Sequence, residues 1–328
     1  MSDNPPGGAT PVSASTNNSL NPAQQQILDE LGSKDRPTFR PELRAELRYE
    51  LESALAPLID EIDEPPLFVS KRKLSMVHSC EGRFLAEEMD EFEWSVPAAR
   101  GTVAHKAIEL LVGWTGTPTP LELVKQAMDR LEADEFKSIA MFLQSLSQGE
   151  RAELTGLVND YVTTFIETFP PLRSVWKPVA ESRVRAELCG EHVAMQGVVD
   201  LSLGFSRGSE AGKVLIDLKS GRPHRSHVDD LRFYALLEML KIGTPPRLLV
   251  NYYLEAGDPR SEVVTEDLLW STSKRVVDAV QKMVELKAQA REPELNASGA
   301  CRFCPARDSC EVGSAYLQKS ESDDTIDD

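Results

Sequence analysis

The chain has 328 residues, of which 41% are hydrophobic and 27% charged, as in ordinary globular proteins. Its formal net charge of −17 argues against nonspecific polyanion binding by the surface as a whole. No apolar run reaches the ~18 residues that span a bilayer. The first ten residues lack the basic-then-apolar order of a signal peptide, so no membrane contact is expected and the expected location is cytoplasmic.

The N-terminal part predicts a tail followed by a helical extension. Residues 1–25 are rich in Pro, Gly, Ser, Thr and Asn, which predicts disorder. Within an extension over 38–66, leucines at helical spacing predict an amphipathic helix from Pro41. Packing against the core is the simpler interpretation of its apolar face, and a docking surface for a protein partner at 41–63 is the alternative.

The remaining elements predict one domain over 68–316. One or two helices are expected at 70–92, another opens at Gly101, and two or three more fill 120–169. A Val-rich alternating stretch over 176–218 predicts an antiparallel meander. A helix at 228–241, a strand at 246–257 and a long helix at 266–291 follow, before an acidic tail over 318–328 that is expected to be disordered. Helices on both sides of a central sheet predict an α/β or α+β domain.

Three ionisable residues lie inside the apolar meander. Asp217 and Lys219 are two apart in a strand and therefore share a face. Asp200, in the preceding strand, is as far from the expected turn as Asp217, so a symmetric hairpin places the two carboxylates opposite each other. A divalent cation would offset their repulsion, and Lys219 would then position a water or balance a phosphate charge. A structural Asp–Lys ion pair is the alternative.

The cysteines point to a second metal site. Cys301, Cys304 and Cys310 form C-x2-C-x5-C, and three thiolates this close favour a metal over a disulfide in a reducing compartment. A fourth ligand from elsewhere in the chain would complete either a zinc site or a four-iron cluster. Cys189, in a predicted strand, is interpreted as a buried thiol.

The segments "GVVD" and "VLIDLKSG" resemble the core of the PD-(D/E)xK nucleases, in particular the RecB-like branch that includes Cas4 and AddB. Gly101-Thr-Val-Ala-His105 resembles the Gly-x-x-x-His motif of that branch. The resemblance implies a restriction-endonuclease-like core with a central mixed sheet flanked by helices. It also implies Mg²⁺ or Mn²⁺, with metal ligands at the following positions: His105, Asp200, Asp217, the Leu218 carbonyl and Glu181.

The same resemblance implies further roles. The family's Q-x-x-x-Y helix corresponds to the run that contains Tyr234, but Asp230 stands where the glutamine is usual. Tyr234, Arg232 and Arg222 are the candidates for DNA contact. Cys80 matches the upstream cysteine of the iron–sulfur members, so Cys80, Cys301, Cys304 and Cys310 would bind a [4Fe-4S] cluster that joins the N- and C-terminal segments, with Zn²⁺ as the alternative.

The expected function is therefore metal-dependent hydrolysis of DNA, as an exonuclease on single strands or ends, in repair, recombination or a Cas4-like role. His105, Asp200 and Asp217 would hold the metal, and Lys219 would orient or deprotonate the attacking water. Two alternatives remain at this stage. One is a catalytically reduced DNA- or protein-binding module of the same fold, and the other is a zinc-stabilised regulatory protein whose Asp217 and Lys219 form an ion pair.

Overall fold

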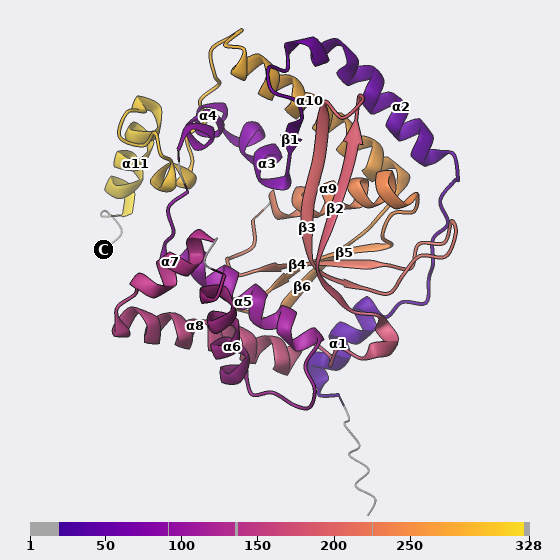
Figure 1. Ribbon diagram of the computed structural model, residues 1–328, viewed down its shortest axis with the longest axis vertical. Helices are drawn as coiled ribbons and strands as arrows, with labels where there is room; N and C mark the ends of the chain where they lie inside the picture. The colour runs from indigo at the N-terminus through magenta and orange to yellow at the C-terminus, as the bar shows by residue number, and fades with distance from the viewer. Residues whose placement is uncertain (1–19, 91, 135–136, 225, 325–328) are drawn as a thin grey trace, which may run out of the picture.

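A six-stranded mixed sheet forms the centre of the molecule (Figure 1). The computed structural model describes residues 20–90, 92–134, 137–224 and 226–324, with side chains to 319. The strand order is β1-β3-β4-β5-β6, and β2 pairs with the other edge of β3. The strands are β1 (Leu67–Val69), β2 (Val179–Leu188), β3 (Val193–Leu203), β4 (Val214–Lys219), β5 (Leu248–Tyr253) and β6 (Asp258–Val263).

Strands β2, β3 and β4 form the predicted antiparallel meander. Leu201 pairs with Ile216 and Leu203 with Val214, which is the symmetric register expected for the hairpin. Strand β5 then runs parallel to β4, and β6 returns antiparallel to β5. The sequence did not reveal β1 or β6, because a three-residue strand has no measurable period and β6 is a polar edge strand.

Helices cover both faces of the sheet and enclose two apolar cores (Figure 1). One core lies under α2, α3, α4, α9 and α10, and the other under α1, α5, α6, α7 and α8. The α-helices are α1 (Pro22–Leu31), α2 (Leu43–Leu55), α3 (Lys71–Ser79), α4 (Glu81–Met89), α5 (Val96–Val112), α6 (Pro120–Glu132), α7 (Ser138–Ser145), α8 (Gln148–Thr168), α9 (Ser226–Ile242), α10 (Glu266–Lys287) and α11 (Glu311–Asp324). Short 3-10 helices are η1 (Ala56–Glu61), η2 (Ser174–Trp176) and η3 (Gly299–Phe303).

Helix α5 begins before the predicted start at Gly101. The Ser95 side chain accepts a hydrogen bond from the Ala98 amide, and a proline in the first turn fixes a helical φ there. Gly101 lies inside the helix and lets it approach the sheet, since an added Cβ would lie 3.1 Å from the Ser220 hydroxyl. The glycine therefore sets the height of α5 over the end of β4.

The apolar face of α2 belongs to the core. Leu43, Leu47, Leu51 and Leu55 are fully buried and pack in the cluster that α9 and α10 cover. The predicted helix is thus present, but the docking surface proposed for 41–63 is not available on its leucine face, because the chain's own helices occupy it. The leucine face of α2 is therefore a packing surface, as the simpler interpretation predicts.

The tails are shorter than the sequence indicated. Residues 22–25 lie in α1, whose first turn is closed by reciprocal hydrogen bonds between Asn21 and Gln24. Helix α11 continues to Asp324, into the stretch expected to be disordered. Residues 1–19 and 325–328 lie outside the described residues. Among the described helices, each is too short or too polar to cross a bilayer.

Truncation of Leu51 tests the packing of α2. Because Leu51 is fully buried, Leu51→Ala should lower the free energy of unfolding by about 2–5 kcal/mol, measured by urea denaturation. Tyr49 on the same helix is 70% exposed, so Tyr49→Ala should change it by less than about 0.5 kcal/mol. Equal effects of the two substitutions would show that α2 does not pack as described.

Candidate active site

A break in the pairing of β3 creates the site. On one edge of β3, β1 pairs as far as Met195 and β4 pairs only from Leu201 onward. Residues 196–200 therefore have no strand partner on that edge. Since β1 is parallel to β3 and β4 is antiparallel to it, the carboxyl ends of β1 and β4 approach each other across this break. Side chains from three strands meet there.

Asp200 lies at the break, opposite Asp217 in the observed register. Its Oδ2 accepts a hydrogen bond of 2.7 Å from the Leu218 amide, so a side chain replaces the backbone partner at this point. On the other edge, the ladder with β2 omits the Glu181–Asp200 pair, and Glu181 has a left-handed φ of +51°. Such a backbone conformation is uncommon for a non-glycine residue and is concentrated at functional sites.

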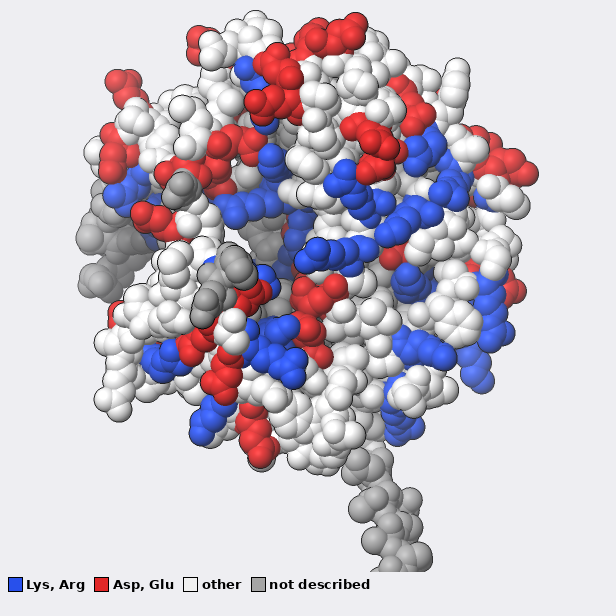
Figure 2. All heavy atoms as spheres, viewed as in Figure 1, with Lys and Arg blue, Asp and Glu red and all other residues white. Residues whose placement is uncertain are grey.

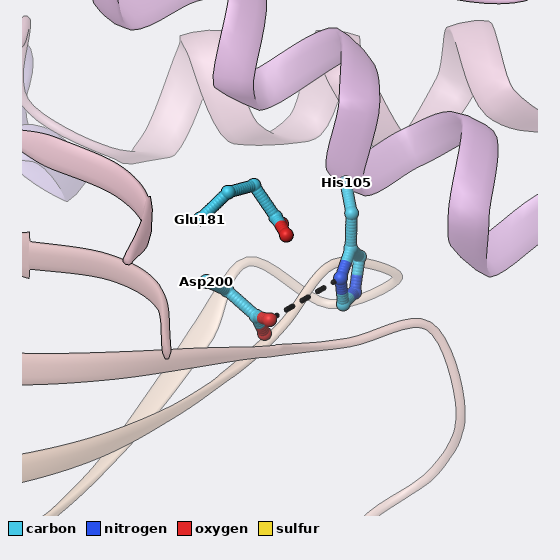
Figure 3. Close-up of side chains that lie close together, drawn as sticks. All are labelled: His105, Glu181 and Asp200. Carbon is cyan, nitrogen blue, oxygen red and sulfur yellow. Dashed lines mark ion pairs between the residues drawn. The ribbon is translucent and has the colours of Figure 1, made fainter. Parts of the chain in front are cut away.

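Three side chains form a group suited to a metal ion (Figure 3). His105 on α5, Glu181 on β2 and Asp200 on β3 each offer a ligand atom, and these atoms all lie within 4.8 Å of one another. His105 Nδ1 lies 3.5 Å from Asp200 Oδ1, and its Nε2 lies 2.9 Å from the Leu218 carbonyl oxygen. Ligand bonds of about 2.0–2.6 Å fit a divalent cation in such a space.

Asp217 lies in a second group beside the first. Lys71 Nζ donates to Asp217 Oδ1 at 2.6 Å, and Lys219 Nζ lies 2.7 Å from Oδ2. The approach of Lys219 does not meet hydrogen-bond geometry, which leaves Oδ2 buried without a hydrogen-bond partner. Lys219 also donates to Asp230 at 3.0 Å. Asp217 and Lys219 are thus ion-paired, and Asp217 is not part of the His105 group.

Charges within the site shift its protonation equilibria. Burial lowers the pKa of His105, but the adjacent Asp200 carboxylate outweighs it and raises the pKa to about 9. Burial raises the pKa of Asp217, and Lys71 and Lys219 together hold it well below its usual range. Partial removal from water and the Asp200 charge raise the pKa of Glu181. The site thus holds a protonated histidine beside carboxylates at neutral pH.

Of the three residues expected to contact DNA, Tyr234 is buried, Arg232 is ion-paired and Arg222 is exposed. Tyr234 is 2% exposed and its ring fills the space above Gly197, where an added Cβ would lie 2.3 Å from the ring. Arg232 is ion-paired with Glu262, and Arg222 is exposed. Stacking of a base on Tyr234 is therefore incompatible with this packing. The tyrosine instead supports Lys71, whose ammonium lies 5.2 Å from the ring centroid.

Lys71 is the site residue that the sequence did not reveal. It was visible only as part of a basic run at 71–73, directly after the short strand β1. Asp230, the departure from the glutamine of the related motif, contacts Lys219. The sequence signal for Lys71 was its position at the start of α3, directly after the helix-capping Ser70 and the end of β1.

The four cysteines that the resemblance assigns to one cluster line a single cavity of about 400 Å³. Cys80 ends α3 and begins α4, while Cys301, Cys304 and Cys310 belong to the segment around η3 and α11. No three thiols in the described part of the chain lie within 4.8 Å of one another. Cys189 is half-buried elsewhere, with Sγ 3.8 Å from the Glu52 carbonyl oxygen.

An ion pair ties the two ends of this cysteine region together. The Arg291 guanidinium donates to both oxygens of Glu81, at 2.6 and 2.8 Å, and the Glu294 amide donates to Glu81 at 2.8 Å. Glu81 follows Cys80 directly and is buried. These contacts join the segment that begins α4 to the segment that precedes the three C-terminal cysteines.

Solved structures resemble the chain at low similarity, and two of them are described here. One is the crystal structure of a protein titled "Putative exonuclease" from Eubacterium rectale, with 12% identity, a TM-score of 0.40, and coverage of 70% of this chain and 84% of that one. The other, titled SSO0001, has 12% identity, a TM-score of 0.36, and coverage of 81% and 95%. Similarity at this level carries no functional argument.

A family model is the informative comparison. None of the curated proteins matches the chain. The model described as the PD-(D/E)XK nuclease superfamily matches residues 69–311, a span that runs from the end of β1 to the start of α11 and contains both groups of the site. The chain belongs to the PD-(D/E)XK nuclease superfamily.

Proposed function

We propose that this nuclease hydrolyses phosphodiester bonds of DNA with a divalent metal, as an exonuclease on single strands or strand ends. The convergence of the His105 group and the Asp217–Lys219 group at the break in β3 carries the proposal. One group supplies metal ligands and the other supplies a cation beside them, which are the two components that metal-assisted hydrolysis needs.

The roles follow from the contacts of each residue. His105, Glu181 and Asp200 would hold Mg²⁺ or Mn²⁺, which activates water and stabilises charge on phosphate. Asp217 Oδ2 is buried and has no hydrogen-bond partner, although Lys219 is ion-paired with it, and this supports Asp217 as a further ligand. Lys71 balances the other oxygen. The Leu218 carbonyl faces the same histidine and stays a proposed ligand. Lys219, between two carboxylates, would orient the attacking water and steady the phosphate.

The surface beside the site suits a flexible, charged strand. Lys and Arg gather in a band across the middle of the face in Figure 2, over β2 and β3 and beside a hollow between α3 and α5, despite the net charge of −17. Asp217 is only 2% exposed, so the backbone of a nucleic-acid strand must bend inward to bring a phosphate close to it. A single strand or a frayed end bends more easily than a stiff duplex, which supports this substrate class.

The cysteine cavity supports a [4Fe-4S] cluster bound by Cys80, Cys301, Cys304 and Cys310. Zinc–sulfur bonds of about 2.3 Å bring tetrahedral thiolates within about 4 Å of one another. Because none of the described cysteines form such a trio, the larger cluster fits the cavity better than a single zinc ion. The cluster would act as a structural tie between the N-terminal helices and the C-terminus.

A catalytically reduced binding module is the second candidate. One observation favours it: Asp217 and Asp230 form ion pairs with Lys71 and Lys219, so these four charges neutralise one another in part. A buried ion network of this kind can be purely structural. Activity assays on purified protein separate the two functions.

Loss of the Asp217–Lys219 group tests the nuclease. With Mn²⁺ and end-labelled single-stranded DNA, Lys219→Ala and Asp217→Asn should each lower the cleavage rate by at least about 100-fold. Lys241→Ala, at the exposed end of α9, is the matched control and should cleave at the wild-type rate. An inert wild type over varied ends, strands and metals would favour the binding module, and full activity of Lys219→Ala would exclude the role given to Lys219.

Metal binding should be coupled to a proton on His105. The pKa of about 9 means that His105 is protonated at pH 7, whereas a metal takes the neutral imidazole. Mn²⁺ affinity should therefore rise by up to about tenfold per pH unit between pH 6.5 and 8. Calorimetry in buffers of different ionisation enthalpy should show release of about one proton at pH 7, which His105→Asn abolishes. Affinity independent of pH would contradict His105 as a ligand.

Substitution of single cysteines tests the cluster. Protein purified without oxygen should contain about four irons and four sulfides per chain and absorb visible light. Cys304→Ser should lose this absorbance and lower the melting temperature, because the tie between the terminal segments is weakened. Cys189→Ser, which lies outside the cavity, should keep both properties. Zinc at one ion per chain would replace the iron–sulfur assignment.

A further inference from the structure

A second cavity lies away from the metal site. It has a volume of about 430 Å³ and is enclosed by α1, the end of α8, η2 and the loop between β3 and β4. None of its lining residues belongs to the His105 or Asp217 group. Two glycines shape the loop, since Gly204 has a φ of +75° and an added Cβ would lie 2.7 Å from the Gly212 carbonyl oxygen. The space matches the size of small-molecule sites.

Three arginines line this cavity: Arg36, Arg207 and Arg247. Within the described residues, none of them forms an ion pair with a carboxylate, although Glu210 also lines the cavity. Arg247 is 7% exposed, donates to the Leu31 carbonyl oxygen, and leaves its Nε buried without a partner. A buried guanidinium N–H without an acceptor is costly, so an anionic group would satisfy it.

Aromatic rings stand beside these arginines. Phe169, Trp176 and Phe205 line the cavity, and the Arg207 guanidinium lies 5.1 Å from the Phe205 ring centroid. Phe205 is about half exposed, so part of its ring is accessible to a ligand. Aromatic faces and arginines together bind planar rings that carry phosphate.

We propose that this cavity binds a phosphate-bearing ligand with a planar ring, the chemistry of a nucleotide. The arginines contact the phosphate, and Trp176 or Phe205 stacks on the base. The ligand is either a free mononucleotide or the phosphorylated terminal nucleotide of a DNA strand. A strand end as the ligand rests on the proposed nuclease function, whereas a free mononucleotide does not.

Binding is measured by calorimetry on the full chain in EDTA, which prevents cleavage and makes the result independent of the nuclease proposal. The probes are adenosine 5′-monophosphate and one single-stranded oligonucleotide with either a 5′-phosphate or a 5′-hydroxyl. Arg207→Ala and Arg36→Ala, both at exposed positions, should each weaken phosphate-dependent binding about tenfold. Arg173→Ala, exposed nearby but outside the lining, is the control and should bind as wild type.

Each outcome decides the proposal. Binding of the mononucleotide that both arginine variants weaken supports a free nucleotide as ligand. Preference for the phosphorylated oligonucleotide alone, weakened in the same variants, supports a strand end. Absence of phosphate-dependent binding at millimolar concentrations, or equal binding by wild type and both folded variants, overturns it. Thermal unfolding of each variant shows that the substitution has not disrupted the fold.

Discussion

The site depends on one constraint: β1 and β4 share an edge of β3 without meeting. Residues 196–200 therefore lack strand partners on that edge, and backbone groups there need other acceptors and donors. The Asp200 carboxylate takes the Leu218 amide, and His105 contacts the Leu218 carbonyl oxygen. The break that would weaken an ordinary sheet thus supplies the opening in which metal ligands from α5, β2 and β3 converge.

Ion pairs stabilise the side chains that line this opening. Asp217 is almost fully buried, and an unpaired carboxylate there would be strongly destabilising. Lys71, just after β1, and Lys219, at the end of β4, neutralise the Asp217 carboxylate. Lys219 also forms an ion pair with Asp230. A cation bound beside His105 would compete with these ammonium groups for Asp217. Contacts with neighbouring strands and helices thus fix the positions of Asp200 and Asp217, which reduces the reorganisation that binding of metal and phosphate would require.

The sequence allowed the central pair to be predicted because local geometry determines it. A symmetric hairpin has one register, and that register places Asp200 opposite Asp217. Lys71 was missed because it depends on a parallel pairing between segments more than 120 residues apart, through a strand of three residues. Arg232 and Tyr234 were expected to contact DNA because a sequence motif carries no information on burial. In the structure Arg232 forms an ion pair with Glu262, and the Tyr234 ring packs against Gly197. Glu181 came from resemblance, and its left-handed backbone was not predictable from residue type.

The central claim is that the His105 group binds a divalent cation at the break in β3. A crystal soaked in Mn²⁺ and measured at a wavelength with strong manganese anomalous scattering locates that ion directly. The account predicts an anomalous peak within about 2.5 Å of His105, Glu181 and Asp200, with Asp217 turned toward it. A peak elsewhere, or none at millimolar Mn²⁺ while Lys71 and Lys219 still enclose Asp217, would contradict it.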